Sequence, residues 1–144
     1  MKTVKKISAE ETYPIRKEIL RKNIDLPYKF NGDLDEKTFH LGAFLGEELV
    51  GIASFMQTDV SVFNERAYQL RGMATIEKVR GEGLGSLIID EASRILVKEE
   101  ISLIWCNARE VAVKFYERNG FSISGDCFDI AKVGPHYKMI KKLS

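Results

Sequence analysis

The residues with the clearest chemistry in this sequence form a glycine-rich turn at the start of a predicted helix. The turn lies within the run Met73-Ala74-Thr75-Ile76-Glu77-Lys78-Val79-Arg80-Gly81-Glu82-Gly83-Leu84-Gly85-Ser86. The first N–H groups of a helix have no partner inside the helix, and its N-terminus carries a partial positive charge. Glycines let a ligand approach the main chain closely because they have no Cβ. The turn therefore predicts a cradle for phosphate, with Arg80 adding a positive charge at its mouth.

Two other phosphate-binding turns do not fit this run, and one further interpretation stays open. A P-loop needs a lysine after its glycines, and no lysine lies between Gly81 and Ser93. A dinucleotide-binding turn needs the pattern G-x-G-x-x-G, but Ser86 stands where the third glycine belongs. The open alternative is a glycine-rich helix start that binds no ligand.

A second pattern follows the turn after one predicted helix and one predicted strand. It has the spacing A-x-x-x-Y-x-x-x-G-F and consists of Ala112, Tyr116, Gly120 and Phe121. This pattern resembles the later motif of the GNAT acetyltransferases. The spacing of Arg80, Gly83 and Gly85 resembles the acyl-CoA pyrophosphate signature of the same family. The resemblance in the order of elements extends over the whole chain, although only the segment 68–121 carries family-specific residues.

The resemblance implies an acetyl-CoA-dependent N-acetyltransferase. Acetyl-CoA (coenzyme A) would be the co-substrate, and a primary amine would attack it directly through a tetrahedral intermediate. A non-catalytic acyl-CoA-binding or interaction domain of the same fold stays open as the alternative. Family members often have Asn where this chain has Arg109, and Asn107 is the expected substitute. The implied cofactor-binding residues are Met73, Ala74, Thr75, Arg80, Gly81, Glu82, Gly83, Leu84, Gly85, Ser86, Asn107, Ala112 and Phe115.

The resemblance assigns a catalytic role to Tyr116, whose phenol would protonate the departing thiolate. The alternative is an aromatic residue that only packs on an amphipathic helix. The acceptor amine must also lose a proton, and the open candidates for the base are Glu77, His136 and a water relay. His40 lies in an apolar run and is interpreted as a satisfied core histidine.

The acceptor is expected to bind between two loop segments, Arg16–Glu36 and Phe128–Tyr137. These segments carry apolar and aromatic side chains, namely Leu26, Tyr28, Phe30, Phe128, Ile130 and Tyr137. Acidic residues are interspersed among them, namely Asp25, Asp33, Asp35 and Asp129. Such a mixture predicts a compact pocket for a small-molecule amine, in which a carboxylate holds the ammonium group. The alternative is that the aromatic residues only close the core beneath two loops.

The elements that must position these residues indicate one mixed α/β (α+β) domain over 1–144. An early helix begins at Ser8 or at Thr12, and Thr12 is preferred because it puts Pro14 in the first turn. With the resemblance, the order of elements predicts a mostly antiparallel central sheet flanked by helices, with a splayed parallel strand pair. The pattern predicts strands at 3–7, 38–45, 49–56, 68–76, 103–107, 121–128 and 137–140, and helices at 83–98 and 110–118.

Composition and charge argue against several classes of protein. The chain has 144 residues, of which 44% are hydrophobic and 30% charged, and its net charge is +1. These values are typical of one globular domain and predict neither a nucleic-acid nor a membrane partner. No apolar run approaches about 18 residues, so a cytoplasmic protein is expected, and a homodimer is a possible assembly. Cys106 and Cys127 are interpreted as two buried thiols, and no metal site is predicted.

Overall fold

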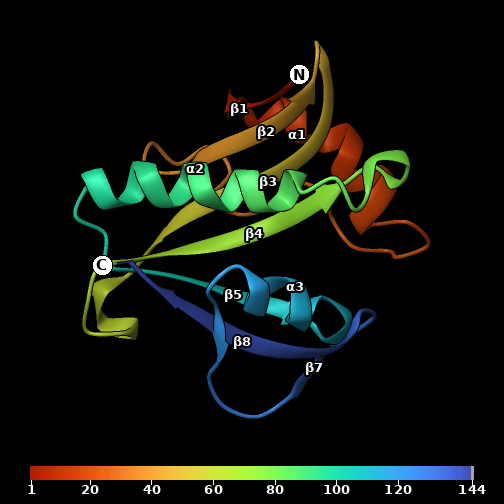
Figure 1. Cartoon of the computed structure of the whole chain (residues 1–144). Helices are drawn as coiled ribbons and strands as arrows, with labels where there is room; N and C mark the ends of the chain where they lie inside the picture. Colours follow the sequence, from red (N-terminus) through yellow and green to blue (C-terminus); the bar gives the residue numbers. More distant parts are fainter. Residues whose placement is uncertain (144) are drawn as a thin grey trace.

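One mixed sheet runs through the molecule in the computed structural model, which describes residues 1–143 (Figure 1). Within these residues the sheet has eight strands in the order β1-β2-β3-β4-β5-β8-β6, and β7 pairs with β8. All paired strands are antiparallel except β4 and β5, which confirms the predicted mixed sheet. The strands are β1 Lys2–Ile7, β2 Phe39–Leu45, β3 Glu48–Thr58, β4 Ala67–Thr75, β5 Leu103–Arg109, β6 Ser122–Ile123, β7 Phe128–Ile130 and β8 Gly134–Lys142.

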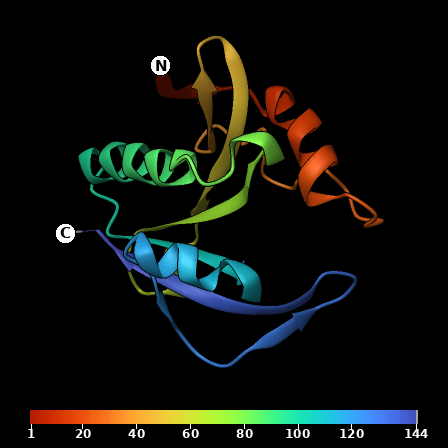
Figure 2. The same ribbon diagram turned by 45° about the vertical axis from the view of Figure 1, so that its right-hand side comes forward.

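Helices cover both faces of the sheet (Figures 1 and 2). On one face lie α1 (Ala9–Ile15) and the π-helix η1 (Arg16–Leu20), which pack on a small cluster around Ile52 of β3. We call this the α1 face. On the other, the α2 face, lie α2 (Leu84–Lys98) and α3 (Val113–Arg118), which pack on the main core. The remaining short helical turns are η2 Val60–Val62, η3 Glu77–Val79 and η4 Glu110–Ala112.

Helix α2 forms where the sequence has its longest helical periodicity, and this prediction is confirmed. Its buried stripe recurs every three or four residues and consists of Leu84, Ile88, Ile89, Ala92 and Leu96. Complete burial of one large aliphatic side chain stabilises a fold by about 1.5–3 kcal/mol. The chain turns after α2, because Glu100 has a positive φ of 61° and the Ile101 N–H donates to the Leu96 carbonyl over 3.0 Å. None of the helices within 1–143 is long and apolar enough to cross a membrane.

The parallel strands β4 and β5 pair at only one end. Their register joins Ala67 to Leu103, Tyr68 to Ile104 and Gln69 to Trp105. Beyond Gln69, β4 continues beside β3 as far as Thr75, whereas β5 continues beside β8 as far as Arg109. The two strands therefore diverge towards the end that carries the glycine-rich turn, which confirms the predicted splayed pair (Figure 1).

A β-bulge in β4 changes the direction of its side chains just before the turn. Between Arg71 and Ala74, β4 has one residue more than β3, and Gly72 has the positive φ of 65° that such a bulge favours. Leu70 and Met73 pack on the α2 face, whereas Ala74 packs on the α1 face. Because successive side chains of a strand point to opposite faces, Arg71, which follows Leu70, points to the α1 face.

The first helix begins after Ser8, so the preference for Thr12 as its N-cap was wrong. Ser8 and Glu11 form a capping box, in which the Glu11 N–H donates to Ser8 Oγ over 3.1 Å and the Ser8 N–H donates to Glu11 Oε1 over 2.9 Å. These bonds satisfy donors that the helix itself leaves unpaired, and they fix its start despite Pro14 inside it. Because Pro14 lacks an N–H, one helical bond is missing, and the chain continues as the wider η1.

The single strand predicted at 121–128 was also wrong, because two shorter strands, β6 and β7, occupy this region. The residues between them, 124–127, are exposed, and Gly125 turns the chain with a φ of 93°. An exposed polar segment gains nothing from the core, so β6 ends at Ile123. The Ser124 N–H still donates to the Lys138 carbonyl of β8 over 2.9 Å, and strand pairing resumes at Phe128. The helix predicted at 110–118 begins as the 3₁₀ turn η4 and continues as α3.

Candidate active site

A cavity of about 1190 Å³ lies between the diverging ends of β4 and β5. Its walls come from both strands, the turn before α2, α3, the loop after η1 and the start of β8. Glu82 lies outside this wall, where Lys2 of β1 donates to its carbonyl over 2.6 Å. The other predicted site residues all line it, so both motifs meet at one cavity. They are Met73, Ala74, Thr75, Arg80, Gly81, Gly83, Leu84, Gly85, Ser86, Asn107, Ala112, Phe115 and Tyr116.

The turn before α2 contributes main-chain N–H groups to this wall. Gly83 is the N-cap residue of α2 and has a left-handed φ of 78°, which residues with a Cβ rarely adopt. No side chain caps the helix, and the Leu87 N–H makes a helical bond to the Gly83 carbonyl over 3.1 Å. The N–H groups of the three residues in between have no partner inside the helix. An anion suits this position, and the exposed Arg80 adds positive charge beside it.

Gly85 is required for packing rather than for ligand access. A methyl group at this position would lie 2.7 Å from Cζ of Phe115 and 3.7 Å from Sδ of Met73. By contrast, a methyl group at Gly81 or Gly83 would meet nothing within 4 Å. The last glycine of the motif thus lets α2 approach Phe115 of α3, and the two earlier glycines shape the turn.

Tyr116 of α3 belongs both to the cavity wall and to the core. Its side chain is 7% exposed, and its ring makes edge contacts with Phe115 and Phe121 at centroid distances of 5.1 and 5.2 Å. Burial, and then the neighbouring Cys106, raise the pKa of Tyr116, whereas Arg109 opposes this shift. The phenol is therefore protonated at neutral pH and can act as a hydrogen-bond donor towards the cavity.

Alternation along β5 divides its residues between the two faces of the sheet. Cys106 and Ala108 pack in the main core under α2, so Asn107 and Arg109 point to the α1 face. Both line the cavity, and Arg109 Nη2 donates to the Leu20 carbonyl over 3.2 Å. Arg109 is therefore held towards η1, while the exposed Asn107 is available to a ligand.

Of the candidate bases, His136 lines the cavity and Glu77 does not. His136 lies opposite Arg109 in the β5–β8 register and is 4% exposed. Its Nδ1 lies 2.8 Å from the Gly134 carbonyl, which can only accept, so Nδ1 carries the hydrogen. The Nε2 then has the lone pair that can accept a proton. Glu77 is exposed, at η3.

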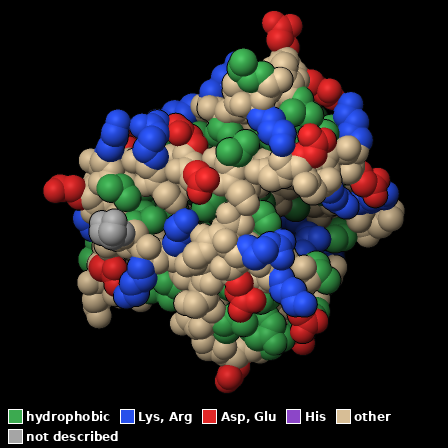
Figure 3. All heavy atoms as spheres, viewed as in Figure 1, with side chains coloured by type: hydrophobic (Ala, Val, Ile, Leu, Met, Phe, Trp, Pro, Cys, Tyr) green, Lys and Arg blue, Asp and Glu red, His purple; other side chains and the backbone are tan. Residues whose placement is uncertain are grey.

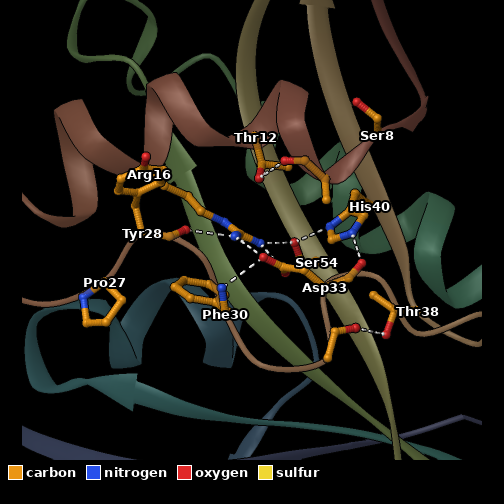
Figure 4. A network of polar contacts seen from close by, with 12 residues as sticks. Ser8, Thr12, Arg16, Pro27, Tyr28, Phe30, Asp33, Thr38, His40 and Ser54 are labelled. Carbon is orange, nitrogen blue, oxygen red and sulfur yellow. Dashed lines mark hydrogen bonds and ion pairs between the residues drawn. The ribbon is translucent and has the colours of Figure 1, made fainter.

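A buried polar network supports the α1 side of the cavity (Figure 4). Arg16 is fully buried and donates to the two carboxylate oxygens of Asp33 over 2.7 and 2.9 Å, and to the Tyr28 carbonyl over 2.9 Å. It also donates to Ser54 Oγ over 2.9 Å, and that hydroxyl lies 2.6 Å from His40 Nδ1. His40 Nε2 donates to the Asp33 carbonyl over 3.0 Å. This network confirms His40 as a satisfied core histidine.

The ion pair in this network is formed at neutral pH. Burial alone would raise the pKa of Asp33, but hydrogen bonds from Arg16 and the Phe30 N–H, with the nearby positive charges, outweigh burial and lower it. Asp33 therefore stays charged and joins the loop before β2 to η1. This loop carries Phe30, whose ring lies 3.8 Å from the guanidinium carbon of Arg16 and lines the cavity.

The charge of the cavity wall is opposite to the one that the sequence predicted. No Asp or Glu among residues 1–143 lines the cavity, so the predicted carboxylate for an ammonium group is wrong. Asp33 is bound to Arg16, while Asp25, Asp35 and Asp129 are exposed on the surface. Lys and Arg side chains instead gather around the hollow below α2 (Figure 3). Those that line the cavity are Arg21, Lys29, Arg71, Arg80, Arg109 and Arg118.

The remaining predicted residues divide between the cavity and the rest of the molecule. Among the apolar residues expected around the acceptor, Leu26, Phe30 and Ile130 line the cavity, and Tyr28, Phe128 and Tyr137 do not. Cys106 is buried as predicted, and burial raises its pKa to about 12. Cys127 is exposed, contrary to the prediction, because it lies in the segment between β6 and β7.

Comparison with known proteins identifies the family. A model described as the acetyltransferase (GNAT) family matches residues 3–121. The uncharacterized N-acetyltransferase YitI of Bacillus subtilis (strain 168) is 40% identical over 145 residues, which cover 99% of this chain and 97% of that protein. The fold, the cavity and these matches define an acyltransferase. The chain belongs to the acetyltransferase (GNAT) family, as the resemblance of its two motifs predicted.

Solved structures share the fold at low sequence identity. Escherichia coli ElaA aligns with a TM-score of 0.82 and 18% identity, over 98% of this chain and 99% of that chain. An aminoglycoside 6'-N-acetyltransferase complexed with coenzyme A aligns with a TM-score of 0.75 and 12% identity, over 99% of this chain and 97% of that chain. These similarities confirm the predicted architecture.

Proposed function

We propose that this chain transfers an acetyl group from acetyl-CoA to a primary amine of a small molecule. The observation that carries the proposal is one cavity, between diverging strands, that residues of both motifs line. Membership of the family supports acyl transfer, and the coenzyme A bound by a protein of the same fold supports a coenzyme A thioester as the donor. A cavity of about 1190 Å³ suits a small acceptor beside such a donor.

The turn before α2 is proposed to bind the pyrophosphate of acetyl-CoA. The N–H groups of Leu84, Gly85 and Ser86 would donate to its oxygens, and Arg80 would offset its charge. Beyond Gln69, the facing edges of β4 and β5 no longer pair with each other. Their N–H and C=O groups are therefore available to the amides of the pantetheine arm. The residues of both motifs that line the turn and the gap between the two strands remain the proposed binding residues for acetyl-CoA.

Tyr116 is proposed as the general acid. When the C–S bond of the thioester breaks, the electron pair leaves on sulfur, and a protonated phenol can supply the proton. Burial keeps the phenol of Tyr116 protonated by raising its pKa. The edge contacts with Phe115 and Phe121 hold the ring, and they give the hydroxyl a defined position at the cavity wall.

His136 is proposed as the base that prepares the amine. The ammonium group gives a proton to His136 Nε2, and the neutral amine then attacks the carbonyl carbon to form the C–N bond. As the intermediate collapses, the C–S bond breaks and the sulfur receives the proton of Tyr116. The nitrogen loses its extra proton to solvent on becoming an amide, His136 releases its proton to solvent, and solvent returns a proton to Tyr116. The products are an N-acetylated amine and the thiol of coenzyme A.

Calorimetric titration with acetyl-CoA, together with detection of thiol released in the presence of primary amines, tests this proposal. Gly83→Asp adds a carboxylate beside the pyrophosphate, whereas Gly83→Asn adds an uncharged side chain of similar size. Asn and Asp both tolerate left-handed backbone, so both variants should keep the folded circular dichroism spectrum. We expect Gly83→Asp to weaken binding by about 100-fold and Gly83→Asn to weaken it far less.

Two outcomes would contradict separate parts of the proposal. Unchanged acetyl-CoA affinity in a folded Gly83→Asp variant would overturn the assignment of the turn. Tight binding of acetyl-CoA without thiol release for any amine would overturn catalysis and favour a non-catalytic acyl-CoA-binding domain.

A further inference from the structure

Three arginines meet on the α1 face of the cavity. Arg21 follows η1, Arg71 lies in β4 and Arg109 ends β5. Arg21 Nη1 and Arg109 Nη2 both donate to the carbonyl of Leu20, over 3.4 and 3.2 Å. The guanidinium carbons of Arg21 and Arg71 lie 5.5 and 4.5 Å from the ring centre of Phe30. Elements distant in the sequence thus bring together three guanidinium groups, which we call the arginine triad.

No acidic residue among residues 1–143 forms an ion pair with the triad. Arg16, on the same face, is paired with Asp33. Burial, and then the charges of Arg109, Arg71 and Arg16, lower the pKa of Arg21. Burial, and then the charge of Arg16, lower the pKa of Arg71, and the charge of Asp33, which is itself paired with Arg16, opposes this shift. Because like charges at this range repel, a bound anion would relieve an unfavourable arrangement.

The triad is separate from the phosphate cradle. In β4, Leu70 packs on the α2 face and Arg71 points to the other face. In β5, Ala108 packs on the α2 face and Arg109 points to the other face. The glycine-rich turn belongs to the α2 face, because it leads directly into α2. With the donor held by that turn and the strand gap, the triad lies in the part of the cavity that remains for the acceptor.

The proposed base limits the distance between the two functional groups of the acceptor. His136 and Arg109 are directly opposite in an antiparallel pair. Residues paired in this way have Cα atoms about 4.5–5.5 Å apart, and their side chains lie on the same face. An amine at His136 and an anion at Arg109 can therefore belong to one small molecule that carries them a few atoms apart.

We propose that the arginine triad binds an anionic group of the acceptor, and that the acceptor is a small amine bearing a carboxylate or a phosphonate or phosphate a few atoms away. Guanidinium groups match the paired oxygens of both kinds of anion. The ring of Phe30 offers apolar surface for the rest of the molecule. Amino acids are the simplest members of this class. The inference rests on the proposed acetyl transfer and specifies its substrate.

Matched acceptors test the inference directly. Each α-amino acid is compared with the amine that lacks its carboxylate and with the corresponding aminophosphonate, and kcat/KM is measured by thiol release. We expect the carboxylate or the phosphonate to exceed the neutral amine by about 30-fold or more, the loss that follows when one partner of a buried charge pair is missing. The ratio between the two acids identifies which anion the triad prefers.

Variants of the triad show whether the preference arises there. Arg71→Gln should remove most of the preference for the acid while acetyl-CoA affinity stays within about twofold. Arg71→Lys keeps the charge without the fork and should retain part of the preference, which also covers a Gln variant that fails to fold. Arg94→Gln, on the exposed side of α2, is the matched control and should leave the preference intact.

The outcomes separate this inference from the proposed function. Equal kcat/KM for acids and neutral amines, with thiol release intact, would overturn the triad and leave acetyl transfer standing. An Arg71→Gln variant that loses acetyl-CoA affinity would overturn it too, because the triad would then serve the donor. Direct calorimetry of amino acids in the presence of coenzyme A adds a readout without chemistry. Binding of amino acids that requires the arginine triad, without thiol release, would support the triad and contradict acetyl transfer.

Discussion

The two faces of the sheet contribute to one cavity by different physical means. On the α2 face, main-chain N–H groups and close packing shape the wall, and Gly85 lies directly against Phe115 of α3. On the α1 face, long cationic side chains and one buried ion pair, Arg16 with Asp33, form the wall. Main-chain N–H groups are present whichever side chains the sequence carries, whereas side-chain groups change with each substitution. Substitutions that change substrate preference are therefore expected on the α1 face.

Removal of one hydroxyl should have the largest effect, and it would locate the chemistry on the α2 face. We expect Tyr116→Phe to lower kcat by about 10²–10⁴-fold, because the departing thiolate loses its proton donor. Acetyl-CoA affinity should change little, since the ring contacts with Phe115 and Phe121 remain. Steady-state kinetics and calorimetry measure the two quantities. Tyr137→Phe, outside the cavity wall, is the control, and a Tyr116→Phe rate within twofold of the parent would leave Tyr116 a packing residue.

Loss of the buried carboxylate should have the next largest effect, on the stability of the α1 face. Asp33→Ala leaves the fully buried Arg16 without its partner, and this should lower the free energy of unfolding by about 3–5 kcal/mol. Chemical denaturation measures the change. Asp129→Ala removes an exposed carboxylate and should be close to neutral. Equal midpoints for the two variants would mean that the ion pair does not support this face.

A methyl group at Gly85 should have a smaller effect, and it tests packing on the α2 face. The contact of 2.7 Å with Phe115 requires a shift of α2 or α3, which should cost about 1–3 kcal/mol of stability. Phe115→Leu removes the ring that causes the clash. In the double variant the two losses should therefore be less than additive by about 0.5 kcal/mol or more in denaturation experiments. Full additivity would contradict a direct contact.

The smallest expected effect is the pH dependence that Asp33 gives to the stability of the α1 face. The pKa of Asp33 is lower in the folded chain, so the unfolded chain binds this proton first as the pH falls. The stability from Asp33 is fully present above the ordinary aspartate pKa of about 3.9 and is lost as the pH falls through the lowered folded value. The gap in unfolding free energy between the parent and Asp33→Asn should therefore narrow below about pH 4. A constant gap from neutral to acid pH would argue against this linkage.

The α2 face could be predicted from the sequence because its determinants are local. The turn at 80–86 and its helix are contiguous, and the helical periodicity of α2 gives the helix bounds almost to the residue. Tyr116 stands at a fixed spacing from Gly120 and Phe121, so the second motif can also be recognised from the sequence alone.

The start of the first helix, on the α1 face, was predicted wrongly because of Pro14. The rule that places proline in the first turn was outweighed by the capping box at Ser8.

The α1 face could not be predicted because its determinants are distant from one another. Arg21, Arg71 and Arg109 form no motif, and only the divergence of β4 from β5 brings them to one cavity. The acidic residues misled the prediction for the same reason. Their positions in the loops could be read from the sequence, but the burial of Arg16 and its pairing with Asp33 could not. Strand alternation was the available signal, because it could have placed Arg109 away from the buried Cys106.

The extra residue of β4 at the bulge separates the part of this strand before Gly72 from the part after it, so the two parts can change independently in evolution. Before Gly72, the ladder with β3 sets the direction of Arg71, and after Gly72 the side chain of Met73 packs on the α2 face. Substitutions at Arg71 can therefore alter the α1 face, where we propose that the acceptor binds, without altering the α2 face. Deletion of one residue at the bulge would instead move the side chains on one side of it to the opposite face of the sheet. Descendants of this chain are thus expected to differ by substitution at Arg71 while they preserve the length of the strand.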